Sequence, residues 1–91
     1  MSVEQITLLP IFLEVDGVPV MLVELSKQET AWGETYYIAS VKVIYKGIAS
    51  RVFPLYVKDS KDLLNKLKVE ITKIKFIDHM YGLEEVRRII S

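Results

Sequence analysis

The stretch from Ser60 to Met80 constrains the fold most, because its apolar residues recur at the spacing of one helix face. Asp59 or Ser60 can accept a hydrogen bond from an amide of the first turn, and Gly82 can end the helix in the left-handed conformation. A helix of about 20 residues is about 30 Å long and can lie along a sheet from end to end. At 100° per residue its core-facing stripe contains Leu63, Leu64, Leu67, Ile71 and Ile74, with Ile77 just beyond.

Two apolar residues, Val69 and Phe76, project from the opposite side of this helix. Either they are tolerated in solvent, or another surface covers them. An alternative is that Val69–Ile77 is a fifth strand, because the segment is rich in β-branched residues. The regular stripe from Leu63 to Ile74 favours the helix.

An Asp-Gly pair between two apolar runs predicts a β-hairpin, because a type I′ turn needs a positive φ at both central residues. The predicted strands are Leu8–Val15 and Val18–Leu25, around Asp16-Gly17. Val15 should then lie opposite Val18. Pro10 lacks an amide donor on the outer side of the first strand, which indicates an edge strand.

The second strand is apolar on both faces, whereas a sheet with one wet face should alternate apolar and polar residues. One long helix covers only one face of a sheet. The other face therefore needs cover from the C-terminal segment or from a second copy of the chain. The two apolar sets are Val18, Val20 and Leu22 on one side, and Met21, Val23 and Leu25 on the other.

The segment Ser26–Glu34 is polar and is predicted to be a loop, in which Trp32 either closes the end of the core or contacts a ligand. Thr35–Tyr45 and Ile48–Lys58 are predicted as the third and fourth strands, around Lys46-Gly47. A plain two-residue turn there would oppose Lys42 with Arg51, which is unfavourable. We therefore expect a bulge or a longer turn, with Gly47 in the left-handed conformation.

After Gly82, the segment Leu83–Ile90 predicts a short second helix, with Leu83, Val86 and Ile90 on one face. The predicted fold class is α+β. Four strands form an antiparallel meander in the order ββββα, with the long C-terminal helix on the sheet and a short final helix. Ninety-one residues predict a single domain over residues 1–91.

The charges are unevenly distributed although the formal net charge is zero. Residues 1–34 carry a net charge of −5, and residues 42–75 carry +6. This asymmetry indicates either a basic face for an anionic partner or acidic and basic elements that are neighbours in the fold. One Asn and two Gln among many Lys, Glu, Ile and Val are typical of thermophile proteins.

The N-terminal residues Met1–Gln5 lack the basic region of a signal peptide, and the apolar run Ile6–Leu13 is too short to span a bilayer. A soluble, cytoplasmic protein without a membrane partner is expected. The absence of cysteine excludes disulfides and thiol chemistry.

No catalytic or metal-binding pattern is recognisable in the sequence. His79 is the only histidine, and no further ligands occur at zinc-site spacing. The four glycines are scattered, so there is no phosphate-binding loop. We expect no cofactor and no enzymatic activity.

One group of residues combines aromatic rings with basic side chains, as single-strand nucleic-acid binders do. The group comprises Tyr36, Lys42, Tyr45, Arg51 and Tyr56 of the predicted third and fourth strands, with Lys66 and Lys73 of the helix. The order ββββα is similar to that of the Whirly and transcription-coactivator single-strand binders. This resemblance is one of topology, and it implies single-stranded nucleic acid as a partner.

The excess of apolar surface over available cover predicts self-association, since one surface can serve both partners of a symmetric dimer. The candidate interface residues are Val69, Phe76, Met21 and Val23. The preferred interpretation is a non-catalytic binding or assembly module that acts as a homodimer. A single-strand nucleic-acid binder is the alternative.

Overall fold

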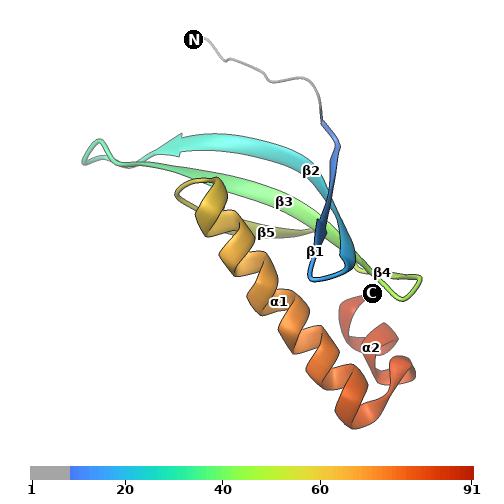
Figure 1. Cartoon of the computed structure of the whole chain (residues 1–91). Helices are drawn as coiled ribbons and strands as arrows, with labels where there is room; N and C mark the ends of the chain where they lie inside the picture. The colour runs from blue at the N-terminus through green and yellow to red at the C-terminus, as the bar shows by residue number, and fades with distance from the viewer. Residues whose placement is uncertain (1–8) are drawn as a thin grey trace.

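The computed structural model describes residues 9–91 of the chain. An antiparallel sheet is followed by a long helix and a short one, which confirms the predicted α+β class (Figure 1). Leu8, the predicted start of the first strand, lies outside the described residues. The elements are β1 (Ile11–Val15), β2 (Val18–Glu29), β3 (Thr35–Tyr45), β4 (Ile48–Ala49), β5 (Phe53–Val57), α1 (Ser60–Tyr81) and α2 (Leu83–Ile90).

The first hairpin has the predicted turn and register. Asp16 and Gly17 have φ values of 51° and 80°, as a type I′ turn requires, and Val15 pairs with Val18. The strand order is β1-β2-β3-β4, with β5 also paired to β3. In the described part of the sheet β1 is therefore an outer strand, as Pro10 indicated.

A β-bulge at Val23 changes which side chains of β2 face the core. The register shifts between Leu22 and Glu24, so Val23 is an extra residue without a partner on β3. Leu25 then pairs with the fully buried Ala39, on the core side of the sheet. The prediction that Met21, Val23 and Leu25 share one face is wrong for Leu25. Without the bulge, Glu24 would take a core-facing position, which would bury an unpaired charge.

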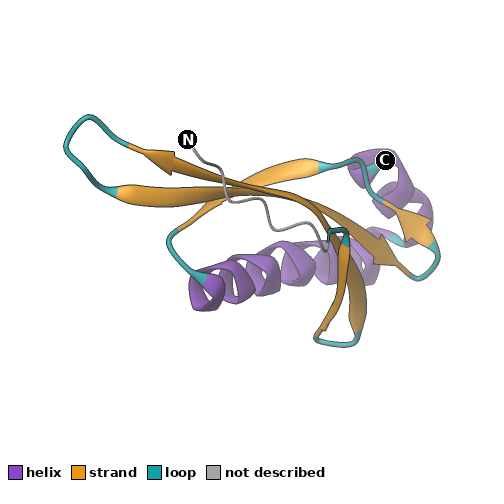
Figure 2. Cartoon of the chain, turned by 90° about the horizontal axis from the view of Figure 1, so that it is seen from above, coloured by secondary structure: helices purple, strands orange, loops and turns teal. Residues whose placement is uncertain are grey.

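The predicted loop Ser26–Glu34 is wrong over its first half. β2 continues to Glu29, which pairs with Thr35, and only residues 30–34 form the turn. The end of the β2–β3 hairpin projects past the start of α1 as an arm (Figure 2). Polar residues are compatible with a strand here, because the projecting arm is largely in solvent.

The predicted fourth strand is divided into β4 and β5. Tyr45 pairs with Ile48 across a plain two-residue turn, so the expected longer turn is absent, although Gly47 has the expected positive φ of 83°. The expected bulge lies further along, between Ala49 and Phe53, where the register against β3 shifts by one residue. The chain thus leaves β3 before Arg51 can face Lys42.

The side chain of Ser50 makes this break possible inside the protein. Ser50 is 4 % exposed, and its amide donates to the carbonyl of Val43 at 2.8 Å. Its hydroxyl accepts from the Val43 amide at 2.9 Å, in place of a strand carbonyl, and donates to the Arg51 carbonyl. The backbone groups at the break are therefore satisfied although the pairing is interrupted.

The long helix is confirmed, and the alternative of a fifth strand over Val69–Ile77 is wrong. The Asp59 carboxylate accepts from the Asp62 amide at 2.8 Å, and Gly82 ends α1 with a φ of 92°. Four side chains of the predicted stripe are buried against the sheet: Leu63, Leu67, Ile71 and Ile74. Leu64 is 43 % exposed, because it lies about 60° from the centre of the stripe.

The short helix α2 folds back from the end of α1 towards β4 (Figure 1). Val86 and Ile90 are buried in the core, whereas Leu83, predicted on the same face, is 40 % exposed. The Arg51 amide donates to the Ile90 carbonyl at 2.9 Å. This bond fastens the end of α2 to the β4–β5 break.

Candidate interaction surfaces

The sheet face opposite α1 is the first candidate surface. The register places Phe12, Met21 and Lys42 in one row across β1, β2 and β3. Phe12 is 68 % exposed, while Met21 and Lys42 are half-buried. The sequence-predicted residue Val23 is 37 % exposed at the adjacent bulge. We call this surface the open sheet face.

Two tyrosines lie together on the open sheet face. The ring centroids of Tyr36 and Tyr56 are 6.3 Å apart, with the planes tilted by 32°. Ile38, which pairs with Tyr56 across β3 and β5, contributes a half-buried apolar side chain beside them. The rings are aligned to pack on each other, as neighbouring aromatic side chains of a sheet commonly do.

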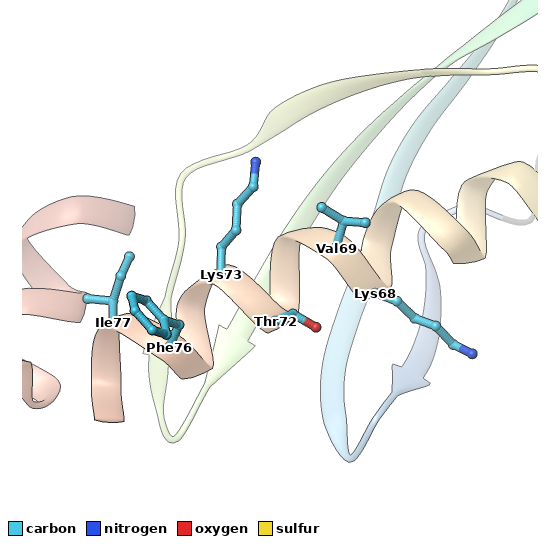
Figure 3. Close-up of a pocket in the computed structure, with 6 residues that line it drawn as sticks. All are labelled: Lys68, Val69, Thr72, Lys73, Phe76 and Ile77. Atoms are coloured by element: carbon cyan, nitrogen blue, oxygen red, sulfur yellow. The ribbon is translucent and has the colours of Figure 1, made fainter. Parts of the chain in front are cut away.

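The outward side of α1 is the second candidate surface. Val69 and Phe76 are 53 % and 61 % exposed, and they line a shallow hollow two helical turns long (Figure 3). Lys68 and Lys73 border it on opposite sides. We call this surface the α1 hollow, formed by Lys68, Val69, Thr72, Lys73, Phe76 and Ile77.

A polar cluster fixes the end of α1 to the β3–β4 turn. Both the Tyr45 hydroxyl and the Lys46 ammonium donate to Oδ2 of Asp78, at 2.7 and 2.9 Å. These two donors hold the pKa of the Asp78 carboxyl below its usual range. Burial, followed by the hydrogen bond to Asp78, raises the pKa of Tyr45. The cluster therefore joins the β3–β4 turn to the C-terminal part of α1.

The residues predicted to bind nucleic acid do not form one surface. Only Tyr36, Lys42 and Tyr56 share the open sheet face. Tyr45 is 5 % exposed and faces the core, and Arg51 donates to the Ser91 carbonyl at 3.3 Å. Lys66 and Lys73 lie on α1, where Lys66 contacts Asp62 and Lys73 contacts Glu70.

The four predicted interface residues are also divided between the two surfaces. Met21 and Val23 belong to the open sheet face, and Val69 and Phe76 to the α1 hollow. Phe12 was not among them, although it lies opposite Met21 in the hairpin register that the sequence predicts. Extending that register along the first strand would have found it.

Trp32 lies at the tip of the β2–β3 arm and is 85 % exposed, so the expectation that it closes the core is wrong. The arm carries it away from the core because β2 and β3 continue past the predicted loop boundary. His79 is exposed on α1. Within residues 9–91 no three metal-ligating side chains come together, and neither helix has the length and apolar content needed to cross a bilayer.

These features define an α+β protein whose sheet has one face covered by a helix and one face open. Comparison of the chain with protein-family models, with curated proteins and with solved structures gave no match.

Proposed function

We propose that the protein is a non-catalytic binding or assembly module that acts as a homodimer through the outward side of α1. The exposure of Val69 and Phe76 in the α1 hollow is the observation that carries the proposal. A helix with one face in the core can leave its other face polar. Here two large apolar side chains stand two turns apart on that face, and their exposure to water is unfavourable.

Introducing a negative charge into the α1 hollow tests this proposal. Phe76→Asp should give a monomer by size-exclusion chromatography with light scattering, because a carboxylate cannot be buried in an apolar contact without a partner. The far-UV circular dichroism should stay unchanged, since Phe76 is 61 % exposed and lies outside the core.

Phe12→Asp is the matched control, because Phe12 is similarly exposed (68 %) but lies on the open sheet face. This variant should remain dimeric. A monomeric Phe12→Asp beside a dimeric Phe76→Asp would assign self-association to the open sheet face and refute the proposed surface.

Single-strand nucleic-acid binding is the second candidate, supported by the Tyr36–Tyr56 ring pair and by Lys42, which lies further along β3 on the same open sheet face. Fluorescence anisotropy with a short labelled single strand, at two salt concentrations, tests it. Affinity that falls with salt and is lost in Tyr56→Ala would support binding. No binding at low salt would exclude it.

A further inference from the structure

The tip of the β2–β3 arm holds Trp32 in an ordered turn. The Thr30 hydroxyl accepts hydrogen bonds from the amides of Trp32 (3.2 Å) and Glu34 (3.1 Å). The backbone closes the turn through Thr30 N to Glu34 O at 2.8 Å. The backbone that carries Trp32 is therefore fixed before contact, so binding has to order only its side chain, which is 85 % exposed.

The arm tip and the α1 hollow are complementary in charge and in chemistry. Glu29 and Glu34 stand on either side of the Trp32 turn, and the hollow presents apolar side chains between Lys68 and Lys73. Lys68 has no carboxylate partner in the part of the chain that the structure describes. Lys73 meets only Glu70, at 3.5 Å in solvent, and such an exposed pair is weak enough to be exchanged.

The chain cannot place its own tip in its own hollow. The arm projects beyond the N-terminal end of α1, whereas the hollow begins at Lys68 and extends towards the C-terminal end (Figures 1 and 3). Phe76 is 16 residues after Ser60, which is about 24 Å along the helix. A second copy of the chain is the occupant that carries this tip.

Contact between two α1 hollows is a poorer arrangement. It would bring Lys68 and Lys73 of one copy close to the same lysines of the other, and like charges oppose such an approach. An acidic arm tip would instead be attracted by these lysines.

We propose that Trp32 of each copy inserts into the α1 hollow of the other, between Lys68 and Lys73, to form a reciprocal pair. This inference rests on the proposed homodimer and specifies its contact. A two-fold axis makes the contact twice and closes the assembly, whereas a single head-to-tail contact would continue into a polymer.

Trp32 is the only tryptophan, so its fluorescence reports on this contact directly. Wild-type protein should show the emission of a solvated indole at low concentration. As dimers form, the emission should shift to the blue and acrylamide quenching should fall several-fold. Phe76→Asp should keep solvated emission at every concentration.

Two further variants test the partners of the contact. Trp32→Ala should be monomeric by sedimentation, while Tyr81→Ala, at another exposed aromatic residue, should remain dimeric. Glu34→Lys should weaken dimerisation about two- to thirtyfold, because a peripheral ion pair is lost at each of the two symmetric contacts, and adding Lys68→Glu to the same chain should restore it.

The results separate this inference from the proposed dimer. Dimers in which Trp32 stays fully quenchable would overturn the reciprocal insertion and leave the homodimer standing. Trp32 protection that persists in Phe76→Asp would also overturn it, because the indole would then lie elsewhere. A chain that remains monomeric throughout would overturn both.

Discussion

Asp78 shows how a single carboxylate joins distant parts of this chain. It accepts from Tyr45 and Lys46, which precede it by more than thirty residues, and so connects the β3–β4 turn to the last turns of α1. The pleat of β3 places the Tyr45 side chain on the core side, where it is 5 % exposed and its hydroxyl needs an acceptor. Asp78 supplies one from the helix side.

The lowered pKa of Asp78 predicts a pH-dependent contribution to stability. The unfolded carboxyl has a pKa of about 4, so between that value and the lower folded value the unfolded state binds more protons. The stabilisation is therefore complete above about pH 4 and is lost as the pH falls through the folded pKa.

Urea denaturation of wild type and Asp78→Asn between pH 7 and pH 2 measures this effect. The wild type should be more stable at pH 7, and the difference should shrink below about pH 4. Asp62 and Glu85, whose pKa values are also lowered, are present in both proteins and cancel in the comparison. A difference that stays constant down to pH 2 would exclude an ionised Asp78 as its source.

At the scale of elements, α1 is held by a narrow buried stripe. Leu67 and Ile71 are fully buried, so Leu67→Ala or Ile71→Ala should lower the free energy of unfolding by about 2–5 kcal/mol. Leu64→Ala is the matched control, since the same side chain is 43 % exposed there and should cost clearly less. Lys68→Ala should change stability by no more than about 0.5 kcal/mol.

Denaturation of these four variants under one set of conditions checks the buried face. Equal losses for Leu64→Ala and Leu67→Ala would mean that α1 is rotated relative to the sheet.

The elements predicted correctly are those that local pattern determines. The Asp16-Gly17 turn sets its own register, and the apolar spacing from Leu63 to Ile74 sets the helix and its face. The bulge at Val23 and the break at Ser50 cannot be predicted from local pattern, because each depends on how the strand pairs with its neighbour. The polar segment Ser26–Glu29 is a strand only because β3 pairs with it.

The candidate surfaces were predictable to a similar extent. The sequence identifies Val69 and Phe76, since their angle on the helix follows directly from the period. It does not show that Trp32 is displayed at the end of an arm, because that depends on how far β2 and β3 remain paired. It also groups Tyr45 with Tyr36 and Tyr56, whereas the pleat of β3 separates them.

At the scale of the whole molecule, the charge asymmetry of the sequence matches the proposed contact. The segment 1–34, which has a net negative charge, includes the arm tip, and the segment 42–75, which has a net positive charge, includes Lys68 and Lys73. Self-association through these surfaces should weaken as the salt concentration rises, because exposed charges are then screened. Light scattering at about 0.05 M and about 0.5 M NaCl should show the change, with the dimer dominant at low salt.

Sedimentation equilibrium of the wild-type protein tests the central claim most directly. At about 50 µM, a dimer with a Kd of about 1 µM or tighter, equivalent to about −8 kcal/mol or more, should give a mean mass close to twice the 10.5 kDa of one chain. On dilution the mean mass should fall towards that of a single chain, and Phe76→Asp should have the mass of a single chain at every concentration. A wild-type mass of 10.5 kDa at about 50 µM would contradict the homodimer.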